Sequence, residues 1–453
     1  MDSISFYGGV NEIGGNKILL ESGETKIWLD FGQSFTMGEK YYLSWLQPRR
    51  NCGLKDYFEF NLLPKIEGLY SENSLIGTGF QYCESCFGGV FLTHAHFDHV
   101  NHISFLDPCI PVYTGKGTKL FLEAMETTSG FANYGIHDYR QFRTGDTIRV
   151  GDVIVKPIHV DHSIPAAYGY IIQTPNSNIV YTGDMRIHGT RADMTQEFLN
   201  EASEVEPDLM ICEGTRLARK EKRRNLSEAQ VESGVKKICE ESDSKNLSVL
   251  YTHPSRDMDR LRTFYRAAES CGRTMVITPK TAHLLHRLIE DEHLELPNPA
   301  RDDLIRVYYK KKKSGTYEDK DYYIWERPYL DQIVTSAEIS ENPQDFLVNL
   351  DFYSFTELID LRPAQGSPFI YSMSEPFTEE DLEEEVLHNW LEHFRLKYHQ
   401  LHASGHMSST ELGQAVNKVK PAKLMPVHSE APYLFTKYYD SVTLPIVGEN
   451  YIL

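Results

Sequence analysis

The segment FLTHAHFDHVNHI at residues 91–103 is unusually rich in potential metal ligands, because it places His94, His96, Asp98 and His99 within six residues. Imidazoles and a carboxylate side by side need partners or water, and a metal ion would satisfy all four at once. Alternate residues of an extended segment face the same way, so His94 and His96 point together, while Asp98 and His99 can point elsewhere at the following turn. One segment can therefore serve two metal ions. Zinc suits this donor set best, with manganese or iron as substitutes.

Two ions need more ligands, and the candidates follow strand-like apolar runs further along the chain. They are His162 in HVDHSIPAAYG, Asp184 in YTGDMR and His428 in LMPVHSE. A carboxylate can bridge two metal ions, and Asp184 is the expected bridge. His159, three residues before His162, is the alternative in that segment.

The elements that must position these residues divide the chain into regions of two kinds. Residues 1–214 begin with strand-like segments and a hairpin at 17–32, in which Asp30 stands at a strand end. Residues 34–88 are aromatic and aperiodic, which indicates an insertion or a long loop region. Short strand-like pieces recur between 144 and 184 and again at 208–214.

From about residue 215 the pattern changes to alternating strands and helices, which predicts a parallel, doubly wound sheet. We expect this α/β unit to span 215–389, with a last strand at 369–375 and the rest of the first domain at 390–453. Capping boxes are expected at Ser227 with Gln230 and at Ser408 with Glu411.

Taken together, these motifs resemble those of a known protein family. HxHxDH, with DFG before it and DHSIP, TGD and PVHSE after it, resembles the metallo-β-lactamase superfamily. GGVNEIGGN at 8–16, CEGT at 212–215 and HASGH at 402–406 are similar to its β-CASP branch of nucleases, and to the ribonuclease J group most of all. The resemblance implies an α/β fold, a metallo-β-lactamase αββα sandwich with an inserted doubly wound α/β (β-CASP) domain.

The resemblance also implies roles for individual residues. The first zinc would be held by His94, His96 and His162, and the second by Asp98, His99 and His428. Asp184 would bridge the two ions, and Asp30 would orient a ligand imidazole from behind.

Further roles follow for the residues around the metals. Water activated by zinc would attack the substrate phosphorus. Asp98, Asp184, Glu213 and His406 would form the catalytic group, in which His406 is the general acid held by Glu213. His402, Ser404 and Gly405 would lie near a substrate phosphate, and HASGH also has the pattern of a helix-capping turn, whose N–H groups bind phosphate readily.

Charge and composition narrow the classes of partner. The chain has 453 residues and a net charge of −19, which argues against a protein that coats nucleic acid with its whole surface but leaves room for a local basic channel. Two basic runs, RLARKEKRR at 216–224 and YKKKKSG at 309–315, are candidates for such a channel or are solvated loops. The sequence shows no transmembrane span and no signal peptide, so we expect a cytoplasmic protein without membrane contact.

The cysteines point to a reducing compartment. Seven are scattered along the chain, which is unlike a disulfide framework. The pair Cys83 and Cys86 forms one CxxC motif that could bind a structural zinc with Cys52. Free thiols are the favoured interpretation, because four ligands are usual for structural zinc.

The leading functional hypothesis is a two-zinc phosphodiesterase that hydrolyses single-stranded RNA, from the 5′ end or internally, with manganese as an alternative metal and a homodimer as one assembly. A DNA nuclease of the same branch, a small-molecule metallo-hydrolase and a non-catalytic binding subunit are the alternatives. One departure from the ribonuclease J group is SMSEP at 372–376, which stands where that group has a glycine-rich strand end.

Overall fold

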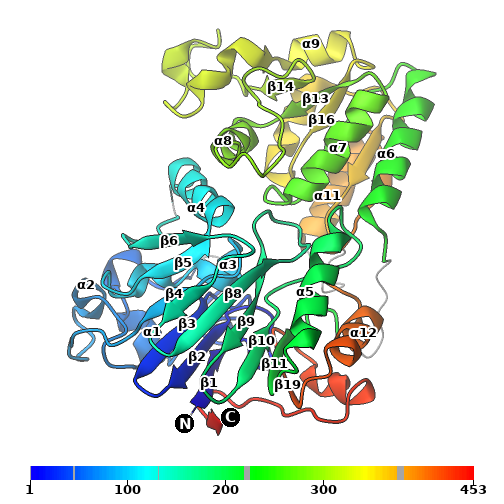
Figure 1. Ribbon diagram of the computed structural model, residues 1–453. Coiled ribbons are helices and arrows are strands. Elements are labelled where there is room, and N and C mark those ends of the chain that lie inside the picture. Colours follow the sequence, from blue (N-terminus) through cyan, green and yellow to red (C-terminus); the bar gives the residue numbers. More distant parts are fainter. Residues whose placement is uncertain (1, 44–45, 131, 219–224, 375–381) are drawn as a thin grey trace.

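The computed structural model describes residues 2–43, 46–130, 132–218, 225–374 and 382–453, and it has two lobes (Figure 1). The larger lobe contains two stacked sheets with helices outside them, and the smaller lobe contains a third sheet with helices on its faces. This mixed α/β architecture agrees with the expected sandwich and its inserted domain. No helix among these residues is long and apolar enough to cross a membrane.

The first sheet of the larger lobe has seven strands and contains both ends of the chain, because the first and last strands pair antiparallel. In spatial order its strands are β20 (Asn450–Ile452), β1 (Asp2–Gly8), β2 (Lys17–Ser22), β3 (Thr25–Phe31), β4 (Gly89–Phe91), β5 (Val112–Gly115) and β6 (Tyr139–Phe142).

The second sheet has six strands, and two of its neighbours are separated by the whole smaller lobe in sequence. In spatial order its strands are β19 (Lys423–Val427), β11 (Leu209–Glu213), β10 (Asn178–Tyr181), β9 (Tyr168–Gln173), β8 (Val153–His159) and β7 (Ile148–Val150). β11 pairs in parallel with β19, from Leu209 opposite Lys423 to Glu213 opposite Val427.

Apolar side chains on the facing sides of the two sheets form one core, which includes Ile18, Leu29, Phe91, Tyr170 and Ile211. The helices of this lobe cover the outer faces, because each presents one apolar stripe to the sheet below it. They are α1 (Lys55–Glu59), α2 (Glu72–Leu75), α3 (Phe97–Val100), α4 (Lys116–Thr128), α5 (Ala192–Glu204) and α12 (Ser409–Val419), with short 3₁₀ helices η1 (Arg50–Cys52), η2 (Ile103–Phe105) and η6 (Pro432–Lys437).

Residues 34–88 contain only short helices in their described part, as the aperiodic sequence predicts. The segment is nevertheless packed, because Leu54, Phe58 and Leu69 join Trp28 in one buried cluster on the outer side of the first sheet. Cys83 and Cys86 are exposed, and the groups of described residues that could hold a metal ion include no cysteine.

The smaller lobe is built on a seven-stranded sheet in which every pair is parallel. Its spatial order is β15 (Ile333–Val334), β14 (Ile305–Tyr308), β13 (Thr274–Ile277), β16 (Phe346–Asn349), β12 (Val249–Thr252), β17 (Pro368–Tyr371) and β18 (Lys397–Gln400). The helices of this lobe are α6 (Glu228–Asp243), α7 (Met258–Ser270), α8 (Pro279–Leu288), α9 (Ser336–Glu341), α10 (Leu358–Leu361) and α11 (Leu382–His393), with η3 (Asp319–Asp321), η4 (Arg327–Gln332) and η5 (Phe352–Glu357).

Local signals placed most of these elements correctly. The capping boxes at Ser227 with Gln230 and at Ser408 with Glu411 are both formed. The last strand of the expected α/β unit ends at Tyr371 and not at residue 375. Residue 375, the end of SMSEP and residues 219–224 of the first basic run lie outside the described residues.

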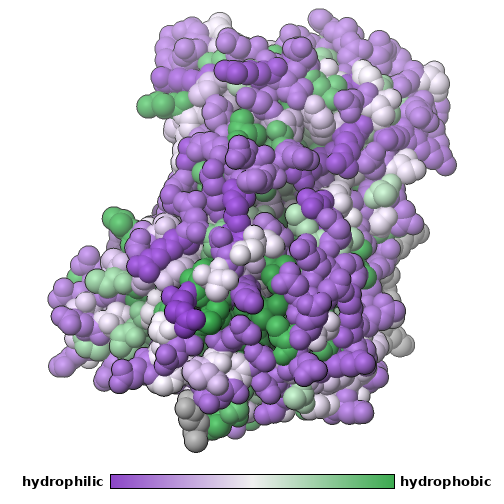
Figure 2. All heavy atoms as spheres, in the orientation of Figure 1, coloured by the Kyte–Doolittle hydropathy of each residue, from purple (hydrophilic) through white to green (hydrophobic). Residues whose placement is uncertain are grey.

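The expected boundary between residues 389 and 390 falls inside α11, and β18 beyond it pairs with β17. A helix and a hydrogen-bonded strand belong with the sheet they complete, so we propose that the smaller lobe continues to Gln400. The surface in this view is predominantly hydrophilic, and Figure 2 shows that the outline of the molecule is indented between the lobes.

Candidate metal centre and active site

The candidate ligands meet because strands of both sheets end at the same edge of the sandwich. His94 follows β4, Asp184 follows β10, Glu213 ends β11 and His428 follows β19. Asp30, near the end of β3, has φ 56° and His428 has φ 53°. The left-handed region is costly for residues other than glycine, and such strain gathers at functional sites.

The first group of ligands contains three imidazoles. His96 Nδ1 lies 3.0 Å from His94 Nε2 and 3.1 Å from His162 Nε2. The Oδ2 atom of Asp184 lies 3.6 Å from His94 Nε2 and 3.9 Å from His162 Nε2. One candidate ligand atom from each of these four residues lies within 4.8 Å of the other three.

The second group shares Asp184. Its Oδ2 atom lies 3.3 Å from His99 Nε2 and 3.8 Å from His428 Nε2. Asp98 Oδ2 lies 2.9 Å from His428 Nε2 and 3.8 Å from His99 Nε2. Asp184 is thus the residue common to both groups, which is the position expected of a bridging ligand.

The chemistry of these atoms fits two bound cations. His99 Nε2 and Asp184 Oδ1 are buried and have no hydrogen-bond partner, although such groups are rarely left orphaned. Burial and neighbouring imidazoles hold the pKa of His94 well below its usual value, which keeps it neutral as a ligand must be. Against burial, the carboxylates of Asp184, Asp30 and Asp98 raise the pKa of His99. The carboxylates therefore make a pocket of negative charge that favours cations.

Asp30 contacts one candidate ligand directly and accepts hydrogen bonds from neighbouring residues that hold the ligands in place. His99 Nδ1 is 2.8 Å from its Oδ2 atom, and the Tyr181 hydroxyl donates to the same oxygen at 2.7 Å. The Thr93 backbone N–H donates to Oδ1 at 2.7 Å, and the Thr93 hydroxyl contacts both oxygens. Thr93 Oγ1 also lies 3.0 Å from His94 Nδ1. Asp30 can in this way fix the orientation of two ligand imidazoles.

A second support, Thr215, was not singled out in the sequence. Its hydroxyl donates to Glu213 Oε2 at 2.7 Å and lies 2.8 Å from His428 Nδ1. Because the hydroxyl proton is directed at Glu213, its oxygen is free to accept the N–H of His428. Nε2 of His428 is then left with its lone pair toward Asp98 and Asp184. The CEGT motif contained this residue, but nothing in the sequence indicated the contact.

The HASGH loop lies against the metal ligands. The Gly405 carbonyl oxygen is 2.7 Å from His162 Nδ1, so it can accept a hydrogen bond from an N–H at Nδ1. With its proton on Nδ1, His162 has a free lone pair on Nε2. His406 Nδ1 is 2.9 Å from Glu213 Oε2 and 3.9 Å from Asp184 Oδ2. Burial opposes the charged form of His406, but Glu213 and Asp184 outweigh it and raise its pKa to about 9. His406 is therefore poised as a proton donor.

The rest of the loop is held by buried arginines from both lobes. Arg186 donates to the Ser404 carbonyl at 3.1 Å, and Arg260 on α7 donates to the Ala403 carbonyl at 2.9 Å. Glu228 on α6 joins them, because its carboxylate lies 3.3 Å from Arg186 and 2.9 Å from Arg260. His402 is outside the metal-ligand groups; its Nδ1 is 3.1 Å from the Ser372 carbonyl, and burial and Arg260 lower its pKa to about 3.

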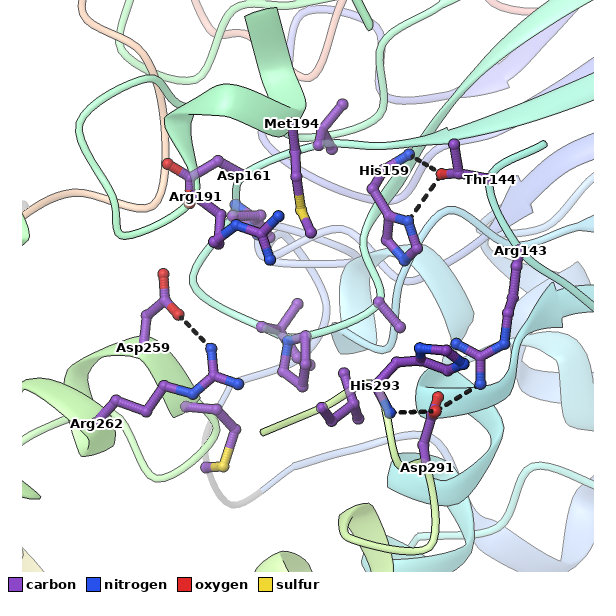
Figure 3. A pocket seen from close by; sticks show the side chains of 17 residues that line it. Arg143, Thr144, His159, Asp161, Arg191, Met194, Asp259, Arg262, Asp291 and His293 are labelled. Atoms are coloured by element: carbon purple, nitrogen blue, oxygen red, sulfur yellow. Dashed lines mark hydrogen bonds and ion pairs between the residues drawn. The ribbon is translucent and has the colours of Figure 1, made fainter. Parts of the chain in front are cut away.

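A cavity of about 380 Å³ adjoins His162 where the lobes meet (Figure 3). Arg143, Arg191 and Arg262 lie around it, and Arg143 pairs with Asp291. His159 also lines this cavity, and its Nδ1 lies 2.7 Å from Thr144 Oγ1. Of the two histidines that competed for the ligand position, His162 is the one in the metal-ligand groups.

Comparison with known proteins agrees with this geometry. The model of the Beta-lactamase superfamily domain matches residues 87–241. The chain is 27% identical to Ribonuclease J of Sinorhizobium meliloti over 76% of this chain and 58% of that protein. It is 22% identical to Ribonuclease J 2 of Streptococcus pyogenes over 93% of this chain and 69% of that protein. With Ribonuclease J of Helicobacter pylori it shares 31% identity, over 42% of this chain and 24% of that protein.

The fold is also found in a solved structure. A crystal structure of a protein of unknown function from Enterococcus faecalis V583 matches with a TM-score of 0.79 and 24% identity, over 100% of both chains. The chain spans little more than half the length of the S. meliloti relative. These findings confirm the resemblance recognised in the sequence: the chain contains a segment that matches the Beta-lactamase superfamily domain, and it is similar to proteins named Ribonuclease J.

Proposed function

We propose that the protein is a two-zinc phosphodiesterase that hydrolyses single-stranded RNA. The observation that carries the proposal is the pair of buried ligand groups that share Asp184, with His406 and Glu213 directly beside them. The relatives named Ribonuclease J support RNA as the substrate. We also propose the cytoplasm as the compartment, manganese as an alternative metal and a homodimer as the assembly to test.

Each residue has a stated task in this reaction. His94, His96 and His162 would hold one ion, and Asp98, His99 and His428 the other, with Asp184 between them. When bound, the two ions supply an activated water and stabilise the negative charge that develops on the phosphate oxygens. His406, held by Glu213, would give its proton to the departing ribose oxygen. Ser404 and Gly405 would position the phosphate through the backbone of the HASGH loop.

The general-acid role of His406 predicts a specific defect. We expect His406→Gln to lower the rate of RNA cleavage by about 10²–10⁴-fold. The same variant should be nearly as active as wild type on bis(p-nitrophenyl) phosphate, because p-nitrophenolate leaves without a proton. Rates would be measured on both substrates, together with the zinc content of the variant. An equal loss on both substrates would show that His406 does not act as the acid.

The proposed substrate can be tested with labelled single strands of RNA and DNA of one sequence, each with a 5′-monophosphate or a 5′-hydroxyl. We expect zinc-dependent or manganese-dependent cleavage of the RNA and none by His94→Ala. Release of mononucleotides would identify an exonuclease, and internal fragments an endonuclease. If both polymers stay intact with every metal, the nuclease proposal is wrong. Cleavage of DNA in preference to RNA would replace RNA with DNA as the substrate.

A further inference from the structure

A second cavity, of about 760 Å³, lies between the smaller lobe and the end of α4 in the larger lobe, and none of the metal-site residues line it. It is at the carboxyl ends of β13, β14 and β16, where Thr278, Tyr309 and Asn349 line it. The chain runs outward from β13 to β15 and returns through β16, so β13 and β16 flank the point where the strand order reverses. Ligands of parallel sheets bind in the crevice at such a point.

Aromatic side chains on one wall of this cavity are exposed to an unusual degree. Tyr353 is 79% exposed and Tyr323 is 68% exposed. The rings of Tyr323 and Trp325 are stacked, with centroids 6.1 Å apart and planes at 10°. Exposed aromatic faces of this kind suit the stacking of unpaired bases, which is tolerant of sequence.

Lysines stand beside these rings. Lys310 and Lys312 come from the basic run YKKKKSG, and Lys280 stands in the first turn of α8. Lys312 is committed, because it pairs with Glu326 at 3.0 Å and lies over the Tyr322 ring at 4.9 Å and the Tyr323 ring at 5.4 Å. Neither Lys280 nor Lys310 forms an ion pair with any other residue in the described part of the chain. These two ammonium groups are therefore available for phosphates.

The lining also contains a buried acceptor that has no donor. Oδ1 of Asp351, another residue of this lining, is buried and has no hydrogen-bond partner. A carboxylate at the end of a parallel strand can accept a hydrogen bond from a ribose hydroxyl. Stacking faces, two free cations and one acceptor are together the groups that a nucleotide unit requires.

The larger lobe also contributes to this cavity. Glu126 and Ser129, at the end of α4, form part of its lining, and Glu126 accepts the backbone N–H of Tyr134 at 2.6 Å. Helices α4 and α8 lie side by side where the lobes meet (Figure 1), and Arg287 on α8 pairs with Glu123 on α4 at 2.6 Å.

We propose that this cavity binds nucleotides of a single-stranded RNA substrate at a distance from the bond that is cut. Bases stack on Tyr323, Trp325 and Tyr353, and Lys280 and Lys310 neutralise the phosphates between them. The inference rests on the proposed RNA substrate of the metal centre, but it assigns a separate binding site with its own residues.

The test measures binding without cleavage. The full chain, treated with EDTA, is titrated into a fluorescently labelled short single-stranded RNA, and anisotropy gives Kd at several salt concentrations. We expect Tyr323→Ala to raise Kd about tenfold and Tyr323→Phe to restore it, because the stacking face is kept. We expect Lys280→Ala to raise Kd and to reduce the slope of log Kd against log salt by about 0.7.

Matched controls lie on other surfaces. Tyr433 on η6 is 40% exposed, and Lys237 on α6 is also exposed. We expect the variants Tyr433→Ala and Lys237→Ala to bind RNA with the Kd of wild type. Equal Kd values for Tyr323→Ala and the controls would overturn the proposal. So would a mononucleotide that competes as well as the oligonucleotide, because the cavity would then be a nucleotide effector site.

The same titration separates this inference from the proposed function. If zinc-loaded wild type binds RNA through Tyr323 but does not cut it, the nuclease proposal fails and the cavity proposal stands. If zinc-loaded wild type cuts RNA while Tyr323→Ala binds with unchanged Kd, the cavity proposal alone fails.

Discussion

Replacing Asp184 with asparagine should remove at least one zinc ion per chain and lower phosphodiester cleavage by about a thousandfold. The substitution keeps the volume of the side chain but removes the charge that both ligand groups share. A metal ion contributes several kcal/mol of charge stabilisation in the transition state, which corresponds to a factor of this size. Zinc would be measured by elemental analysis after gel filtration, and cleavage with labelled RNA.

The matched control for this change is Asp107→Asn. Asp107 is also a buried aspartate of the larger lobe, but it accepts the backbone N–H of Cys109 and belongs to neither ligand group. We expect Asp107→Asn to keep the zinc content and activity of wild type. Full zinc content in Asp184→Asn would contradict the bridging role.

Replacing Glu228 with glutamine should destabilise the protein and reduce cleavage at the same time. Its carboxylate is buried between Arg186 and Arg260 and also accepts the Thr263 hydroxyl. Without that charge two buried guanidinium groups lose their common partner, and breaking a buried pair in this way costs about 3–5 kcal/mol. Urea unfolding would measure the loss. Cleavage should fall because the two arginines hold the HASGH carbonyl groups.

Glu232→Gln serves as the control on the same helix. Glu232 pairs with Lys236 at 2.7 Å, and both side chains are partly exposed, so we expect a change below about 1 kcal/mol. Equal unfolding midpoints for the two variants would show that the Glu228 carboxylate does not stabilise the contact between the lobes.

The sequence could single out the candidate ligands, which lie together in the structure, because their signal is local. The HxHxDH segment contains four candidate ligands within six residues, and His162, Asp184 and His428 each follow a short apolar strand. The capping boxes of α6 and α12 were also correct, since a cap depends on residues three apart. The alternation of strands and helices indicated the parallel sheet of the smaller lobe before any contact was known.

What the sequence did not reveal depends on contacts between distant residues. Thr215 meets His428 from 213 positions away, and Arg186 meets Ser404 from 218 positions away. Neither threonine nor arginine carries a pattern that marks such a contact. The proposed extension of the smaller lobe to Gln400 also rests on a contact between separate segments, because β18 joins that sheet through its pairing with β17. The stacked Tyr323 and Trp325 were hidden among many other aromatic residues.

The adjacency of β11 and β19 has a consequence for the newly made chain. Glu213 and Val427 face each other in the finished sheet, but every residue of the smaller lobe is synthesised between them. His428 is the last of the candidate metal ligands to leave the ribosome, and β20 closes the first sheet later still. A nascent chain therefore lacks one candidate ligand of the second ion until the whole smaller lobe has been made. If the protein cuts RNA as proposed, this order of synthesis protects the message that is being translated from its own product.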